Sequence, residues 1–107
     1  MKRGDLYRVR RPSGDPKKAR VFVVVSRTAF IAVTFPTVVC APVYSRRRGL
    51  ATEVNVGVDE GLKQESAVLC DVLDSLPKSQ LTDYVGTLSP AKLVALKTSL
   101  RIALALE

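Results

Sequence analysis

Apolar and polar side chains alternate along two short stretches of this chain, which is the pattern of half-buried β-strands. The first stretch covers residues 6–9, and the second covers residues 52–58. Because successive side chains of a strand point to opposite faces, the second stretch places Val54, Val56 and Val58 on one face. Both stretches therefore predict strands that cover a core with one side and meet solvent with the other.

Continuous apolar runs predict further strands that differ in how they are buried. Residues 21–25 are β-branched and aromatic, so we expect a strand buried on both faces. Residues 38–44 form a similar run, in which Pro42 favours an edge strand or a bulge. Residues 66–73 and 84–88 are shorter candidates.

The C-terminal segment predicts one helix. Ser89 is a favourable N-cap, Pro90 suits the first helical position, and no helix-breaking residue follows. The apolar stripe expected to pack on the sheet is Leu93, Leu96, Leu100, Ala103 and Leu104. A second stripe of Ala95, Ile102 and Leu106 lies on nearly the opposite side, which indicates either a partner subunit or a small exposed apolar patch.

Several short strands and one terminal helix favour a mainly β (α+β) fold: a small antiparallel barrel covered by that helix. Polar and basic segments at residues 10–18 and 46–49 predict exposed loops, and residues 77–80 predict a turn or a helical turn. A length of 107 residues without internal repeats or linkers predicts one domain, 1–107.

The charge is distributed unevenly along the chain. Residues 1–50 hold twelve Lys and Arg against two Asp, a net +10, whereas residues 51–107 hold five basic against eight acidic side chains, a net −3. A half this basic favours a polyanionic partner, most often nucleic acid. The alternative is a solvated surface that only keeps the protein soluble.

The histidine and cysteine content limits the cofactors that this chain could bind. Histidine is absent, and Cys40 and Cys70 are too far apart in sequence for a metal-binding or redox pair, so we expect no metal or other cofactor and treat both thiols as small core residues.

No apolar run approaches the ~20 residues of a membrane span. The charged N-terminus lacks the apolar core of a signal peptide, and we expect a cytoplasmic protein without membrane contact.

Motifs along almost the whole chain together resemble one family. They are Lys2-Arg3-Gly4-Asp5-Leu6-Tyr7, the loop ending at Arg20 before Val21-Phe22-Val23-Val24-Val25-Ser26, Cys40-Ala41-Pro42-Val43-Tyr44-Ser45, Thr52-Glu53-Val54, Ser66-Ala67-Val68-Leu69-Cys70-Asp71 and Leu81-Thr82-Asp83-Tyr84-Val85-Gly86-Thr87-Leu88. In this order and spacing they resemble the MazF/PemK toxins of bacterial type II toxin–antitoxin pairs.

The resemblance implies an SH3-like barrel with a C-terminal helix and a homodimer. It also implies a metal-independent, sequence-specific endoribonuclease that cuts single-stranded RNA through the 2′-hydroxyl and leaves a 2′,3′-cyclic phosphate and a 5′-hydroxyl. The implied partner is a cognate antitoxin whose acidic, disordered tail covers the RNA site. Operator DNA is expected as a partner only of the toxin–antitoxin complex.

Carried over residue by residue, the resemblance implies four catalytic candidates. Arg20 matches the family's catalytic arginine, and its planar guanidinium suits a scissile phosphate. Ser45 matches directly, whereas Tyr44 stands where the family often has threonine and is either a catalytic hydroxyl, a base-stacking ring or a core aromatic. Asp71 matches an acidic position and is either a base or a group that orients Arg20, although the usual neighbouring arginine is Leu69 here.

The two basic loops supply the expected phosphate contacts. They are Lys17, Lys18, Arg46, Arg47 and Arg48. On single strands each such contact adds about −0.7 to the log–log salt slope of binding. Because of the departures at positions 44 and 69, two alternatives remain: a non-catalytic nucleic-acid-binding regulator, or a gyrase-directed toxin on the same barrel, like the sister CcdB proteins.

Overall fold

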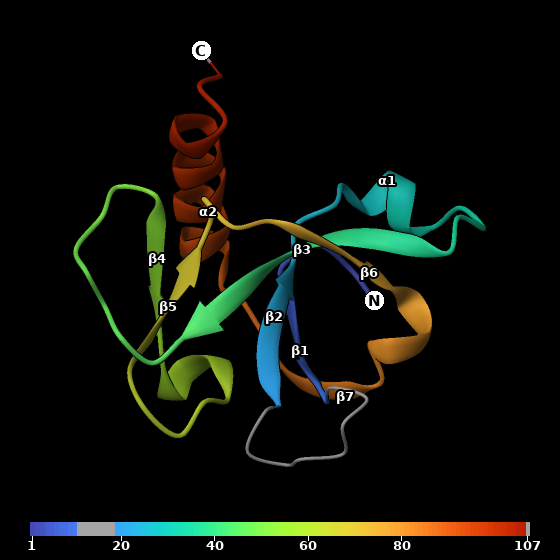
Figure 1. The fold of residues 1–107 in the computed structure, drawn as a ribbon, viewed down its shortest axis with the longest axis horizontal. Coiled ribbons are helices and arrows are strands. Elements are labelled where there is room, and N and C mark those ends of the chain that lie inside the picture. The colour runs from blue at the N-terminus through green and yellow to red at the C-terminus, as the bar shows by residue number, and fades with distance from the viewer. Residues whose placement is uncertain (11–18, 107) are drawn as a thin grey trace.

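A computed structural model describes residues 1–10 and 19–106, and it forms one strongly bent antiparallel sheet with a C-terminal helix (Figure 1). The strands are β1 Asp5–Val9, β2 Arg20–Val24, β3 Thr37–Tyr44, β4 Glu53–Val56, β5 Ser66–Leu69, β6 Asp74–Pro77 and β7 Asp83–Thr87. The helices are α1 Thr28–Ile31 and α2 Pro90–Ala103, with single 3-10 turns η2 Val58–Glu60 and η3 Lys78–Gln80. The expected fold class is confirmed.

The sheet order is β4-β5-β3-β2-β1-β7, and β6 pairs with β3 outside this path. Strand β3 is the central element, because its first half pairs with β6 and its last two residues pair with β5, while β2 runs along its other side. Pro42 pairs in register with Phe22 and falls between the β6 and β5 pairings of β3. β3 is therefore not an edge strand, and its pairing with β2 has no bulge at Pro42, so this expectation is wrong. Proline fits here because neither β5 nor β6 pairs with it.

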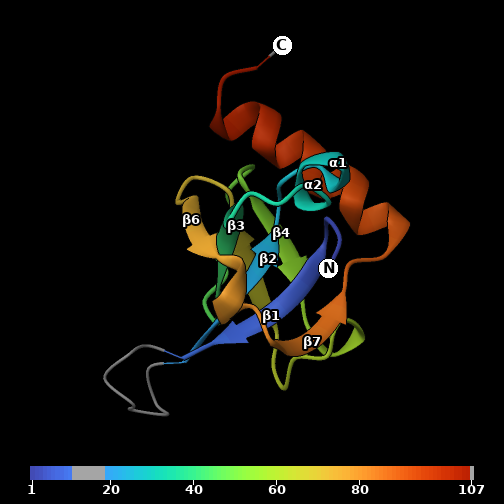
Figure 2. The ribbon, with the colours of Figure 1, turned by 90° about the vertical axis from the view of Figure 1, so that its right-hand side faces the viewer.

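The bend in the sheet divides the apolar interior into two clusters. The larger cluster contains Leu6, Val23 and Leu96, all fully buried, and α2 closes it from above (Figure 2). The smaller one gathers around Val24 and Cys40 near the pairing of β3 with β6. Adjacent residues of β2 thus face different clusters, as expected of a strand buried on both faces, but Arg20, Val21 and Phe22 are only half-buried.

Helix α2 begins as expected. The Ser89 hydroxyl accepts the backbone N–H of Lys92 at 3.2 Å, and Pro90 occupies the first turn. Of the inward stripe, Leu96 is fully buried, but Leu104 is 51% exposed because the helix ends at Ala103. Ile102 and Leu106 of the second stripe are exposed, as the pattern predicted.

Two predicted strands end earlier than the sequence pattern indicates, and one strand and one helix were not predicted. The strand predicted over residues 52–58 ends at Val56, and Val58 is 76% exposed in η2 instead of facing inward. The strand predicted over 66–73 ends at Leu69, and β6, with Leu76 as its one buried residue, was not predicted. The short helix α1 was also missed, whereas the turn at residues 77–80 is confirmed as η3.

The turn η2 is locked against β7 and α2. Glu60 is 2% exposed; its carboxylate accepts the backbone N–H of Gly57 at 2.7 Å and the Lys92 ammonium at 2.8 and 2.9 Å. Gly61 has φ +89°, and Gly86 lies so close to the Glu60 backbone that a Cβ there would meet the carbonyl oxygen at 2.1 Å. A buried ion pair and two glycines therefore fix this corner of the barrel.

Both cysteines are free and buried, as expected of core residues. Burial, with Asp74 nearby, raises the pKa of the Cys40 thiol to about 12; burial, with Asp71 nearby, raises the pKa of the Cys70 thiol to about 11. Across residues 1–10 and 19–106, no helix is long and apolar enough to cross a membrane.

Candidate anion-binding site

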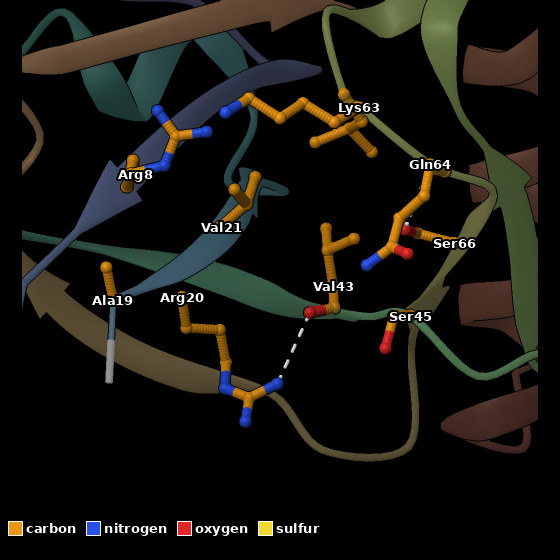
Figure 3. A pocket seen from close by; sticks show the side chains of 10 residues that line it. Arg8, Ala19, Arg20, Val21, Val43, Ser45, Lys63, Gln64 and Ser66 are labelled. Carbon is orange, nitrogen blue, oxygen red and sulfur yellow. Dashed lines mark hydrogen bonds between the residues drawn. The ribbon is translucent and has the colours of Figure 1, made fainter. Parts of the chain in front are cut away.

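A pocket of about 400 Å³ opens where β1, β2 and β3 meet the segment before β5 (Figure 3). Its lining consists of Arg8, Ala19, Arg20, Val21, Val43, Ser45, Leu62, Lys63, Gln64 and Ser66. Two of the four catalytic candidates, Arg20 and Ser45, meet here. Basic groups, amide and hydroxyl groups surround an apolar floor of Val21 and Val43.

Arg20 reaches the pocket from the first residue of β2. Its Nη1 donates a hydrogen bond to the carbonyl oxygen of Val43 at 3.3 Å (Figure 3). Its guanidinium carbon lies 3.9 Å from the centroid of the Tyr44 ring. The backbone contact and the ring hold the guanidinium from two sides. The remaining guanidinium N–H groups have no hydrogen-bond acceptor within the described chain, so they are available to an anion.

Tyr44 and Ser45 divide between the two sides of the sheet, as alternation along a strand requires. Ser45 lines the pocket and is exposed at its rim, whereas Tyr44 is half-buried, lies over Arg20 and is not part of the lining. The Tyr44 side chain therefore acts on the pocket through Arg20 and does not enter it.

The pocket carries three cationic side chains, Arg8, Arg20 and Lys63, and no carboxylate among the described lining residues. Arg8 lies at the pocket because it pairs in register with Val21, a lining residue, whereas Arg20 pairs with Val9. The acid nearest to Arg8 is Asp83, 3.9 Å from Nη1 and 45% exposed. Sequence reasoning missed Arg8 and Lys63; the polar position of Arg8 in its strand was visible, but the strand register that places it opposite Val21 at the pocket was not.

Asp71 is not brought to this pocket. Its Oδ2 accepts the Thr52 hydroxyl at 2.6 Å, and the side chain is exposed. The pocket lies at the Ser66 end of β5, whereas Asp71 lies in the turn that follows the other end of β5 and is not among the lining residues. The structure shows no contact of Asp71 with Arg20, so it offers no support for Asp71 as a base or as an orienting group.

The basic loop after β3 contains arginines in two different situations. Arg47 donates to the carbonyl oxygens of Ser66 and Val56, both at 3.0 Å, and pairs with Glu65 at 3.2 Å. Its guanidinium therefore clamps β4 and β5 together. The side chains of Arg46 and Arg48 are exposed and have no ion pair within the described chain. Lys17 and Lys18 lie outside the described residues.

The sequence matches one protein family along almost its whole length. Residues 2–104 match the family model of the PemK-like, MazF-like toxins of type II toxin–antitoxin systems. The endoribonuclease MazF3 of Mycobacterium tuberculosis is 33% identical over 90 residues, which cover 84% of this chain and 86% of the relative.

Solved structures agree with the sequence comparison. The toxin MazF-mt6 of Mycobacterium tuberculosis superposes with a TM-score of 0.83 at 29% identity, covering 96% of this chain and 98% of the other. A mycobacterial endoribonuclease in complex with its cognate antitoxin gives 0.85 at 30% identity, covering 100% and 97%. With a family model that spans nearly the whole chain and relatives this similar over its length, the chain belongs to the PemK-like, MazF-like toxin family of type II toxin–antitoxin systems.

Proposed function

We propose that this chain is the toxin of a type II toxin–antitoxin pair and a metal-independent, sequence-specific endoribonuclease acting on single-stranded RNA. The observation that carries the proposal is the pocket with three cations and no carboxylate among its described lining residues. Such a pocket suits a phosphodiester, and two relatives of this chain are named as endoribonucleases. The 107 residues act as one domain in this proposal.

The proposed reaction is a transphosphorylation. The 2′-oxygen of the ribose attacks the neighbouring phosphorus, the bond to the 5′-oxygen breaks, and the proton lost by the 2′-hydroxyl is balanced by the proton gained by the leaving oxygen. The products are a 2′,3′-cyclic phosphate and a 5′-hydroxyl. Arg20 stabilises the extra negative charge of the five-coordinate phosphorus, since a guanidinium keeps its proton at neutral pH. Ser45 orients the 2′-hydroxyl or a phosphate oxygen from the rim of the pocket.

The donor chemistry of the pocket supports a reaction without a metal ion. Divalent cations such as Mg²⁺ prefer carboxylate and carbonyl oxygens. The described lining presents ammonium, guanidinium, hydroxyl and amide groups instead, and three of its side chains are positive. In this proposal, arginine and lysine supply the positive charge that a metal supplies elsewhere.

The RNA strand continues from the pocket over the loop after β3. Arg46 and Arg48 are exposed beside Ser45 and are the phosphate contacts that we propose there. Arg47 is engaged with two carbonyl oxygens and Glu65, so we propose that it supports the loop and does not bind phosphate. Lys17 and Lys18 remain proposed contacts from the segment outside the described residues.

The proposed partners follow from the family and the charge. An antitoxin with an acidic, disordered tail competes with RNA for the basic pocket, and one structural relative is described in complex with its cognate antitoxin. The toxin forms a homodimer, acts in the cytoplasm, and meets operator DNA only as part of the toxin–antitoxin complex.

One experiment tests the proposed activity, the cleavage motif and the end chemistry together. A long RNA is incubated with the purified protein in excess EDTA, and the new ends are sequenced. We expect cuts at one short motif in single-stranded regions, with 2′,3′-cyclic phosphate and 5′-hydroxyl ends. Cleavage that depends on an added divalent cation, or ends carrying a 5′-phosphate, would contradict the mechanism.

A non-catalytic RNA-binding regulator is the competing function. The separation of Asp71 from the pocket favours it, because the described lining contains neither a carboxylate nor a histidine to accept a proton. RNA that binds with a steep salt dependence and stays intact in the EDTA assay would support this alternative. The gyrase-directed alternative predicts instead that RNA neither binds nor breaks.

A further inference from the structure

Two cations face each other across the pocket without an acid between them. The Lys63 ammonium is directed toward the Arg8 guanidinium, and both side chains line the same cavity (Figure 3). Like charges repel at short range unless an anion lies between them. The ion pair of Arg8 with Asp83 is long, 3.9 Å, and both side chains are partly exposed, so it offsets little of this repulsion. Lys63 forms no ion pair with any described residue.

This pair of cations is distinct from the position held by Arg20. Arg20 is anchored to Val43 and Tyr44 on one side of the pocket, whereas Arg8 comes from β1 and Lys63 from the segment before β5. Val21 and Val43 form the floor between the two positions. An apolar floor lowers the local dielectric constant, which strengthens the attraction of an anion to each position.

We propose that Arg8 and Lys63 form a second phosphate-binding position, which takes an RNA phosphate next to the scissile one. The inference rests on the proposed function, because a single-stranded RNA presents a phosphate at every nucleotide and so supplies two anions to one pocket. Gln64 points into the same cavity with an amide that can donate to and accept from a base edge (Figure 3). Arg20 and Ser45 then hold the reacting phosphate, and Arg8 and Lys63 set the register of the strand.

The test is the salt dependence of RNA binding. A fluorescein-labelled single-stranded 12-mer with 2′-O-methyl riboses, which cannot be cut through the 2′-hydroxyl, is titrated by fluorescence anisotropy at several salt concentrations. We expect the log–log slope of the double variant Arg8→Gln/Lys63→Gln to be shallower than that of the parent by about 0.7, the contribution of one phosphate. The matched control is Arg27→Gln/Lys97→Gln, which removes the same two charges from exposed positions outside the pocket. Its slope should equal that of the parent.

Two further arms make the result decisive. The charge-conserving variant Arg8→Lys/Lys63→Arg should keep the parent slope, which separates lost charge from lost folding. A slope equal to the parent's in the Gln double variant overturns the proposal. Equal RNA slopes with weaker binding of an acidic peptide also overturn it, since the position would then serve a protein partner.

The binding assay is independent of cleavage. If the slope of the Gln double variant is shallower than that of the parent by about 0.7 but the EDTA assay shows no cuts, the proposed activity fails while the second phosphate position stands. If cuts appear but the slopes of parent and Gln double variant agree, the second position fails alone. A parent that does not bind the 12-mer overturns both.

Discussion

The guanidinium carbon of Arg20 lies 3.9 Å from the centroid of the Tyr44 ring, and Nη1 of the same guanidinium donates to the carbonyl oxygen of Val43 at 3.3 Å. The ring therefore covers one face of the guanidinium, while Nη1 is held by the backbone. A threonine at this position has no ring to do this. Tyr44 is accordingly a positioning residue for Arg20 in the proposed reaction.

Substitutions at Tyr44 separate the ring from its hydroxyl. Tyr44→Phe keeps the stacked ring and should retain cleavage within about twofold. Tyr44→Ala loses a cation–π contact of about 0.5–1 kcal/mol, which corresponds to a decrease in kcat of roughly 2- to 5-fold. The measurement is single-turnover cleavage of an RNA carrying the identified motif, with KM determined alongside kcat.

The opposite ranking would assign chemistry to the hydroxyl. If Tyr44→Phe lost activity as severely as Tyr44→Ala, the phenol would be a catalytic group and the positioning role would be wrong. A loss confined to KM in Tyr44→Ala, with Tyr44→Phe unchanged, would indicate that the ring binds a base, as aromatic side chains do with single strands.

Removal of the Arg20 guanidinium should abolish cleavage without unfolding the protein. Arg20 is half-buried, and within residues 1–10 and 19–106 its side chain forms a single hydrogen bond, so Arg20→Ala should fold normally. Loss of one preorganised donor to a developing oxyanion lowers kcat by about 10²- to 10³-fold. Arg20→Lys keeps the charge but not the planar geometry and should be intermediate. A fully active Arg20→Ala protein with native circular dichroism would exclude the mechanism.

The sequence pattern predicted most of the strands because their residues alternate or form apolar runs, but it did not determine where strands stop. Val58 continues the alternation of Val54 and Val56, yet the chain leaves the sheet at Gly57. β6 has Leu76 as its one buried residue, after the polar Asp74 and Ser75 and before Pro77, and it is a strand because β3 offers an unpaired edge. Local pattern cannot show a partner strand that comes from elsewhere in the chain.

The candidate site was predictable only in part, because the fold brings together residues that are far apart in the sequence. Arg20 and Ser45 were found through the family resemblance, and both line the pocket. Arg8 and Lys63 reach the pocket through strand register and loop geometry, which cannot be deduced from the spacing of residues along the sequence. Arg47 was assigned to phosphate from its charge alone, and only the fold shows that its donors are already occupied.

The buried ion pair between Glu60 and Lys92 should be a point of structural vulnerability. Lys92→Met leaves the carboxylate, which is 2% exposed, with the Gly57 N–H as its one remaining hydrogen-bond partner among the described residues. Removing one member of a buried pair destabilises a protein by about 3 kcal/mol. Urea unfolding measures the change, and Glu60→Gln/Lys92→Met should recover part of it. A loss below about 0.5 kcal/mol in the single variant would show that the pair is no stronger than a surface salt bridge.

The two thiols should be unreactive in the folded protein and should make its stability fall at high pH. Their pKa values are raised from 9.0 to about 12 for Cys40 and about 11 for Cys70, so the reactive thiolate is scarce at neutral pH. The unfolded chain releases these protons near pH 9 and the folded chain does not. The stabilisation is therefore fully present below pH 9 and is lost as the pH rises toward 11–12.

The loss is about 1.4 kcal/mol per pH unit for each thiol within that window. Urea unfolding from pH 8 to 10.5 measures it, and the difference from Cys40→Ala/Cys70→Ala isolates the thiols from other titrating groups. The variant should be less stable at pH 8 but show a shallower decline. Parallel curves for the two proteins, or rapid reaction of the native thiols with Ellman's reagent at pH 7.5, would contradict the burial of these groups.

The exposed apolar side chains of α2 and of the residues that follow it should mediate the proposed homodimer. Ile102 is 52% exposed and Leu106 is 60% exposed, and Val94 adds a third large apolar side chain at 66%. Burial of such side chains in a subunit interface removes apolar surface from water and favours association.

At micromolar concentration, sedimentation should give a species of twice the 11.6 kDa chain mass. Ile102→Glu places a charge in that interface and should shift the equilibrium to the monomer, whereas Ser79→Glu, an exposed position outside α2, should not. A monomeric parent that Ile102→Glu leaves unchanged would show that this face is simply exposed to solvent.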